Sequence, residues 1–241
     1  MPRGLVQRFT HESFACETVD DTKTQRIEEQ TRTQSESQTW KDERKFRITA
    51  SDFHRVKIRK RNHGKLSQDM LSLKSFSTES TKHGLKYEST ALREYGRYME
   101  RSGKPLKVLC SGLCVSKKHF ILGGTPDARI VDPGCREQFG IAEVKCPHSK
   151  FSVNPLEACS DPSFCLEDVG GILTLKTNHA YYDQVQGQVG LTGASWCDFI
   201  VYTRKGLAIT RIAFDEQHWS TLREKLCQYY FKYFLPLVAK S

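Results

Sequence analysis

The chain has 241 residues, of which 38% are apolar, and it carries a formal net charge of +9. No stretch approaches the run of about 20 apolar residues that spans a bilayer, and the N-terminus lacks the apolar segment of a secretory signal. We therefore expect a soluble, intracellular protein, nuclear if its source is eukaryotic and otherwise cytoplasmic. The excess of Lys and Arg favours a polyanionic partner such as nucleic acid, with a solvated basic surface as the alternative.

The first 38 residues are polar and predict an N-terminal arm that is partly helical or flexible. The remainder, residues 39–241, has the length of one domain, whose core is expected to begin near Trp40. Nine cysteines are spread along the chain without a CxxC pair, and their number is odd. They are interpreted as reduced thiols, in keeping with an intracellular compartment, and not as a structural zinc site.

The segment 48–53 resembles a turn into a helix, with Thr49 or Ser51 as the N-cap. The basic stretch that follows, residues 57–61, is interpreted as a solvated loop more readily than as a specific contact.

Hydrophobic spacing predicts the remaining elements in chain order. We expect a helix over 80–101, a meander of short strands at 106–110, 113–116 and 119–122, strands at 128–131 and 141–146, an irregular stretch over 150–172, a helix over 179–190, strands at 199–203 and 207–214, and a terminal helix from Glu216.

Two carboxylates and a lysine form the strongest chemical signal. Glu143 and Lys145 are two residues apart in an expected strand, so their side chains project from one face, while Val144 points into the core. Asp127 opens the preceding strand, and the turn at residues 132–134 folds that strand back beside the next one. One strand end can then hold all three charged groups together.

Phosphodiester hydrolysis requires such a set. Carboxylates supply hard oxygen ligands for Mg²⁺, and Mn²⁺ accepts the same ligands. The metal activates a bound water and neutralises phosphoryl charge, and a nearby lysine can orient the water. Surface Glu and Lys pairs on strands are common, so this spacing alone also fits an ordinary solvated strand.

Other segments of the chain add to this signal. Pro-Asp followed by Glu-x-Lys is the signature of the PD-(D/E)xK nuclease superfamily, and within it the chain resembles the YqaJ family of phage-exonuclease-like proteins. The segments that carry the resemblance are Trp40 with Arg44, residues 48–51, Glu88 in Gly84-Leu85-Lys86-Tyr87-Glu88, residues 142–147, residues 181–188 and residues 196–202. They occur in the family's order from about residue 40 onward.

The resemblance implies an α/β fold of restriction-endonuclease type, with a central mixed β-sheet flanked by helices. It implies that Asp127, Glu143 and the backbone carbonyl of Val144 bind Mg²⁺, with Mn²⁺ able to substitute, and that Lys145 acts on the water. The further roles implied are support of the metal site by Glu88, placement of the water or phosphate by Gln184, and binding of the 5′ phosphate and DNA by Arg44, Ser51 and Gln186.

Some of these residues have simpler explanations. Ser51 could serve only as an N-cap, Glu88 could be an exposed helix residue, and Arg44 could pair with a neighbouring acid. Gln184 and Gln188 share a helix face that Gln186 does not, so the three glutamines cannot all face the metal.

The leading hypothesis is a metal-dependent exonuclease that digests duplex DNA from a 5′ end, preferably a phosphorylated one, for recombination or end processing. The alternatives are an endonuclease of the same superfamily, a DNA-binding module without catalysis, and a metal-binding structural protein, which the lack of paired Cys and His ligands disfavours. Expected partners are duplex DNA with a free end and a single-strand annealing protein, and a homotrimer is one assembly that the resemblance allows.

Overall fold

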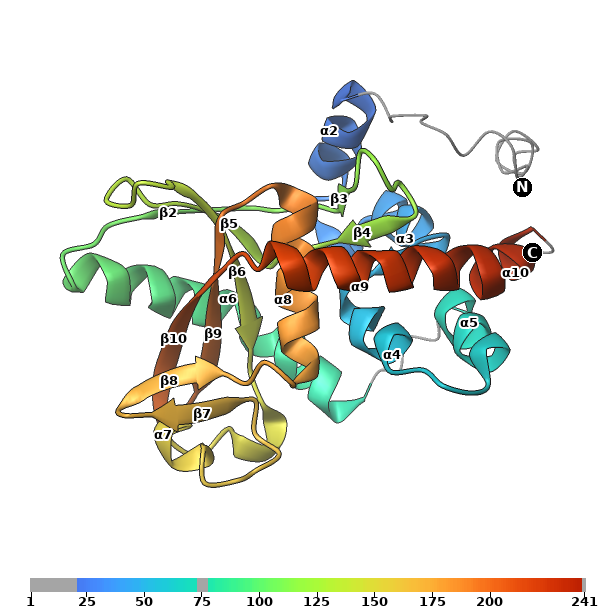
Figure 1. The fold of residues 1–241 in the computed structure, drawn as a ribbon. Helices are drawn as coiled ribbons and strands as arrows, with labels where there is room; N and C mark the ends of the chain where they lie inside the picture. The colour runs from blue at the N-terminus through green and yellow to red at the C-terminus, as the bar shows by residue number, and fades with distance from the viewer. Residues whose placement is uncertain (1–20, 73–77, 240–241) are drawn as a thin grey trace.

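The computed structural model describes residues 21–72 and 78–239. Its centre is a five-stranded sheet in the order β10-β9-β6-β5-β2 (Figure 1). The pairing of β6 with β9 is parallel and the other pairings are antiparallel, so the sheet is mixed. The strands are β2 (Lys107–Leu109), β5 (Ala128–Val131), β6 (Phe139–Lys145), β9 (Trp196–Thr203) and β10 (Gly206–Ala213).

Two helices cover the two faces of this sheet (Figure 1). Alternate residues of a strand face opposite sides. Ala142 and Val144 accordingly pack with α6 (Glu79–Arg101), whereas Ile141 packs with α8 (Ala180–Thr192). Glu143 and Lys145 share the side of Ile141, so the sheet directs both side chains toward α8. The expected fold class, a mixed sheet flanked by helices, is confirmed.

A second layer of structure lies beside the sheet. A small sheet in the order β1-β4-β3 joins β1 (Ile48–Thr49) to β4 (Leu122–Gly124) in parallel and β4 to β3 (Cys114–Val115) in antiparallel orientation. Around it are α2 (Asp21–Gln30), η2 (Gln34–Glu36), α3 (Gln38–Lys45), η3 (Ala50–Asp52), α4 (Phe53–Lys57) and α5 (His63–Leu71). At the C-terminal end are α9 (Glu216–Tyr229), the π-helical turn η5 (Tyr230–Phe234) and α10 (Leu235–Val238).

The predicted arm, residues 1–38, is described from residue 21 onward, and there it packs against the rest of the fold. Ile27 of α2 is buried with Leu113 and Val115 around β3. No helix among the described residues is long and apolar enough to cross a membrane.

Two expectations about the strands were wrong. The stretch 106–122 is not a meander, because β2 joins the large sheet through β5 while β3 and β4 belong to the small one. The stretch 150–172 is more regular than expected, since it contains η4 (His148–Lys150) in part, α7 (Pro155–Ala158) and the strand β7 (Leu166–Val169) that pairs with β8 (Ile172–Leu175). Both errors concern short segments, whose few residues show little hydrophobic periodicity of their own.

Close packing around α8 yields a stability prediction. A Cβ at Gly187 would lie 2.3 Å from the fully buried ring of Phe53. Gly187→Ala should therefore destabilise the protein by about 1–3 kcal/mol, the usual cost of overpacking. Gly96→Ala is the control, because Gly96 also lies in a helix but its Cβ would meet only Val108 at 4.0 Å. That variant should be neutral or stabilising by up to about 1 kcal/mol. Urea unfolding would compare the two, and equal stability would contradict the packing argument.

Candidate active site

The end of strand β6 carries the acidic and basic groups that the sequence singled out. The backbone N–H of Asp127, just before β5, donates to the carbonyl of Ala142 at 3.1 Å. Its side-chain Oδ2 accepts from the backbone N–H of Val144 at 2.6 Å. Pairing of β5 with β6 thus holds Asp127 beside Glu143 and Lys145, so the three residues converge as predicted.

The Glu143 carboxylate is buried, with 3% of the residue exposed. Its Oε1 accepts from Lys145 Nζ at 2.7 Å and from Gln184 Nε2 at 2.6 Å. Its Oε2 accepts from Gln188 Nε2 at 2.8 Å. Because a buried carboxylate is costly unless it is bonded, these three donors compensate for the burial of Glu143.

Lys145 is held from three sides. Beyond Glu143, its ammonium donates to Gln184 Oε1 at 3.2 Å and lies 4.4 Å from the centre of the Tyr181 ring. Burial opposes the charged ammonium, but the carboxylates of Glu143 and Asp127 outweigh it and raise the pKa of Lys145. The arrangement therefore favours an ammonium with a defined orientation.

A cleft of about 550 Å³ opens over these groups, and α6 contributes Glu88 to its wall. Burial raises the pKa of Glu88, and the nearby charge of Glu143 raises it further. The pKa of Asp127 is also raised, by burial first and then by the charges of Glu143 and Glu88. Glu88 is thus no ordinary exposed helix residue, and its carboxylate adds to the negative charge in the cleft.

The crowded carboxylates suit a divalent cation. The groups around the cleft include Asp127, Glu143 and Glu88 as oxygen donors, the ligand type that Mg²⁺ prefers. Their mutual repulsion, visible in the raised pKa values, would be relieved by a cation. Within residues 21–72 and 78–239, no three His, Cys, Asp or Glu side chains already surround one point. Both Glu143 oxygens face Lys145 and the two glutamines.

A smaller cavity of about 180 Å³ adjoins the cleft and shares Asp127 and Glu143 with it. Arg44 and Ser51 line this cavity, as expected for a pair that binds one anion. Arg44 lies 4.1 Å from the centre of the Trp40 ring.

Arg44 does not pair with a neighbouring acid, the simpler explanation for it. Glu43 pairs with Arg47, and Asp42 accepts from Gln38. Burial lowers the pKa of Arg44 to about 10, while the charge of Asp52 opposes the change. A guanidinium in such a position lacks a carboxylate partner among the described residues, which leaves it available to an external anion.

The structure decides between the two N-cap candidates and corrects one expectation about the site. Thr49 occupies the N-cap position of η3 without a side-chain cap bond, whereas Ser51 lies inside this short helix with its hydroxyl 3.2 Å from that of Thr49. Gln186 was expected to bind DNA, but it is fully buried. Its amide donates to the carbonyl of Ala213 and accepts from the backbone N–H of Asp215. Gln186 therefore fixes the segment after β10 and has no surface for DNA.

Gln188 takes a place at the site that the sequence analysis did not assign to it. It lies one helical turn after Gln184 and therefore on the same face of α8. Besides Glu143, its amide donates to the carbonyl of Thr125 at 3.2 Å. The spacing of the two glutamines was the signal for this placement.

Comparison with known protein families agrees with this geometry. Residues 39–195 match the model of the YqaJ-like viral recombinase domain. The chain belongs to this family. Together with the site, family membership indicates a nuclease. No curated protein matches the sequence.

Solved structures share the fold of this YqaJ-type chain. The alkaline exonuclease LHK-Exo from Laribacter hongkongensis has a TM-score of 0.59 at 21% identity, covering 85% of this chain and 99% of its own. A phage-related exonuclease from Haemophilus somnus has a TM-score of 0.53 at 16% identity, with coverages of 80% and 96%. The shutoff and exonuclease protein of Kaposi's sarcoma-associated herpesvirus has a TM-score of 0.52 at 13% identity, with coverages of 85% and 70%. At these identities the likeness shows a common fold.

Proposed function

We propose that the protein is a metal-dependent exonuclease that hydrolyses duplex DNA from a 5′ end, in recombination or end processing. One observation carries the proposal: the cleft that holds Lys145 and the cavity that holds Arg44 share Asp127 and Glu143. A strand whose end occupies the cavity would therefore present a nearby phosphodiester to the carboxylates and the lysine.

Asp127, Glu143 and the carbonyl oxygen of Val144 would hold Mg²⁺, or Mn²⁺ in its place, which when bound lowers the pKa of water and neutralises phosphoryl charge. Lys145 orients the attacking water and stabilises the charge that develops on the phosphate, because its ammonium is fixed by Glu143 and Gln184.

The neighbouring residues have supporting roles in this proposal. Gln184 positions the water or the scissile phosphate from the face of α8. Glu88 supports the metal site from α6 across the cleft. Asp127, Glu143, Lys145, Glu88 and Gln184 thus form the proposed catalytic set.

The end of the strand is recognised in the smaller cavity. A terminal phosphate carries more charge and exposes more oxygens than an internal diester, so it gains more from a guanidinium. The helix that begins at Phe53 has only five residues, and we therefore assign the anion to the guanidinium of Arg44 and the hydroxyl of Ser51 without a helix dipole.

Arg44→Ala should remove a preference for phosphorylated 5′ ends. Charge-assisted hydrogen bonds contribute about 1.5–3 kcal/mol, so the wild type should digest phosphorylated ends at least about tenfold faster than hydroxyl ends. In Arg44→Ala the two rates should become equal while metal binding persists. Lys41→Ala is the matched control, because it removes one exposed positive charge from the same helix. Initial digestion rates on both substrates measure the effect, and loss of the preference in both variants would refute a specific role for Arg44.

The function itself is tested with linear duplexes and closed circles, each with and without Mg²⁺. We expect digestion of the linear duplexes in the presence of Mg²⁺, and no digestion of the circles or of samples without the metal. Equal cleavage of circles would favour a PD-(D/E)xK endonuclease, and binding without cleavage would favour a DNA-binding module.

The family also suggests assembly and partners, which belong to the proposal. Duplex DNA with a free end is the proposed substrate. A single-strand annealing protein would receive the exposed strand, and a homotrimer would keep the enzyme on its substrate. Light scattering with DNA present tests the trimer, which a monomer at micromolar concentration would rule out.

A further inference from the structure

The segment Glu28 to Ser37 lies before the residues that match the family, which begin at 39. It nevertheless reaches the proposed end-binding cavity, because Gln34 and Ser35 line that cavity together with Arg44 and Ser51. This part of the wall is therefore a feature of this chain outside the matched domain.

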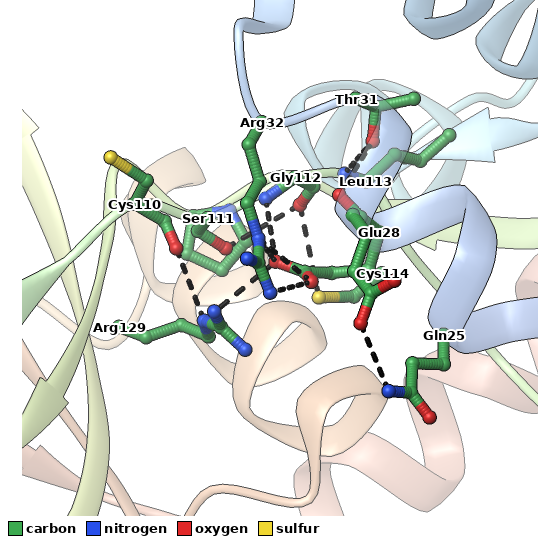
Figure 2. Close-up of polar contacts among 12 residues, drawn as sticks. Gln25, Glu28, Thr31, Arg32, Cys110, Ser111, Gly112, Leu113, Cys114 and Arg129 are labelled. Atoms are coloured by element: carbon green, nitrogen blue, oxygen red, sulfur yellow. Dashed lines mark hydrogen bonds and ion pairs between the residues drawn. The ribbon is translucent and has the colours of Figure 1, made fainter.

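Helix α2 anchors the segment firmly (Figure 2). Glu28, only 9% exposed, accepts from the backbone N–H of Gly112 at 3.0 Å and pairs with Arg32 at 2.7 Å. The fully buried Thr31 accepts from the backbone N–H of Leu113 at 2.7 Å through its hydroxyl. A Cβ at Gly112 would lie 1.9 Å from the carbonyl oxygen of Glu28, so only glycine allows this approach. Satisfied buried groups of this kind fix α2 against the loop before β3.

Gln34 links the anchored helix to the active site. Its amide donates to the carbonyl of Ser111 at 3.1 Å and to the carbonyl of Pro126 at 3.3 Å. Pro126 immediately precedes Asp127, so Gln34 acts on the backbone that carries a proposed metal ligand. The backbone of Gln34 is left-handed, with φ of 46°, a conformation that costs energy for a residue other than glycine. The side-chain contacts and the buried anchor hold it there.

A second contact, made by Trp40, holds the residue before Pro126. The Ser37 hydroxyl accepts from the backbone N–H of Trp40 and so begins α3. The indole N–H of Trp40 donates to the hydroxyl of Thr125 at 3.0 Å, and Arg44 lies over the ring. Gln34 thus holds Pro126 and Trp40 holds Thr125, the two residues that precede Asp127.

We propose that residues 28–37 form an end stop for the DNA strand: Gln34 and Ser35 close the cavity beyond Arg44 and restrict the site to strand ends. The inference rests on the proposed exonuclease function and names what makes it end-dependent. Gln34 is a positioning residue in this scheme, since it acts through the turn at Pro126 and through the shape of the cavity.

The sizes of the two cavities support this arrangement. The open cleft measures about 550 Å³ and the cavity beside it about 180 Å³, with Asp127 and Glu143 at their junction. In this proposal a continuous strand that passes the junction meets the side of the smaller cavity lined by Gln34 and Ser35, whereas a strand end stops before it. Removing the side chains of the wall should therefore admit continuous strands.

The test compares a linear 5′-phosphorylated duplex with a dumbbell of the same sequence whose ends are closed by hairpin loops. The full-length wild type should cleave the dumbbell at least about a hundredfold more slowly than the linear duplex, a difference of ~2.7 kcal/mol. In the double variant Gln34→Gly/Ser35→Gly, the rate on the linear duplex divided by the rate on the dumbbell should fall at least about tenfold, or ~1.4 kcal/mol. The fall should come from new cleavage of the dumbbell. Gaining a substrate is a result that general destabilisation does not produce.

Gln25→Ala is the matched control, because within the part of the chain that the structure describes the exposed Gln25 amide bonds only Glu29 of the same helix. Its rate ratio should equal that of the wild type. Gln34→Asn provides a second variant if the double variant does not fold, because Asn tolerates the left-handed backbone and shortens the amide reach. Gln34→Asn should also lower the rate on the linear duplex relative to the rate on the dumbbell.

Three outcomes separate the two proposals. If the wild type is end-dependent and the folded Gln34 variants keep its ratio or lose both activities equally, the end stop is wrong and the exonuclease proposal stands. If the wild type cleaves the dumbbell as fast as the linear duplex, or cleaves neither, the exonuclease proposal fails and the end stop fails with it. A lower ratio in the variants supports both.

Discussion

Asp127→Asn and Glu143→Gln should each lower the rate of DNA digestion by at least about a hundredfold. Charge neutralisation by a bound metal is worth several kcal/mol, and each ~1.4 kcal/mol is a factor of ten in rate. The two carboxylates converge at one end of β6, so either change should weaken Mg²⁺ binding together with catalysis. Calorimetric titration with Mg²⁺ and single-turnover digestion would measure the two effects in the same samples.

Lys145→Ala separates chemistry from binding. The ammonium contacts Glu143 and Gln184, and its loss should abolish cleavage while leaving much of the metal and DNA binding. Glu137→Gln is the control for all three variants, because Glu137 is an exposed carboxylate in the turn before β6. It should digest DNA at the wild-type rate. Near-normal digestion by Asp127→Asn would refute the assignment of the active site.

Asp183→Asn should have the largest effect on stability, at about 3–5 kcal/mol, the usual cost of breaking a buried charge pair. Asp183 of α8 is 1% exposed. Its Oδ2 is 2.6 Å from His54 Nδ1, and its Oδ1 is 2.8 Å from Lys57 Nζ and 2.7 Å from His218 Nε2. One carboxylate thereby joins α8 to α4 and α9, and its removal leaves a lysine and two histidines without their shared partner.

The destabilisation caused by Asp183→Asn should decrease as the pH falls. Burial raises the pKa of Asp183, but hydrogen bonds from Lys57, His54 and His218 outweigh it, so the pKa is lowered overall. A carboxyl group with a lowered pKa stabilises the fold above its unfolded pKa of about 3.9, and that contribution is lost as the pH falls through the folded pKa. The gap in unfolding free energy between wild type and Asp183→Asn should therefore be full at pH 6 and should narrow below about pH 4.

Urea unfolding across this pH range would measure the gap. Asp52→Asn is the control, since Asp52 forms a partly exposed pair with Arg55 at the start of α4. Exposed pairs are worth about 0–1 kcal/mol, and this variant should lose no more than that. A gap below about 1 kcal/mol for Asp183→Asn, or one that does not change with pH, would show that Lys57 and the two histidines do not stabilise this carboxylate.

The convergence of the proposed catalytic residues could be predicted from the sequence because its geometry is local. Glu143 and Lys145 share a face through the two-residue period of one strand, and Asp127 reaches them through the turn between consecutive strands. The helix that carries Glu88 and the helix that carries Gln184 were likewise visible in short-range spacing. The family resemblance then assigned these separate residues to one site, and they lie close together in the structure.

What required the tertiary structure was the pairing of distant segments. The strands around residues 106–122 have little periodicity of their own, and whether they pair with each other or with β5 and β1 depends on packing that no local pattern encodes. The same holds for Gln186 and Gln188, two residues apart on one helix. Only the position of α8 against the sheet decides that Gln188 reaches Glu143 while Gln186 is buried against the segment after β10.

The N-terminal segment shows most clearly what could not be predicted from the sequence. Its polar composition indicates an arm, since few apolar residues are available to bury there. What holds it in place is instead polar: Glu28, Thr31 and Gln34 bond to backbone groups at residues 111–113 and 126. Because these hydrogen bonds are made to backbone groups, the side chains at residues 111–113 and 126 carry no sequence pattern that would reveal them. The sequence therefore determined the fold class and the convergence of Asp127 and Glu143, while only the three-dimensional packing decided that the arm lines the proposed site.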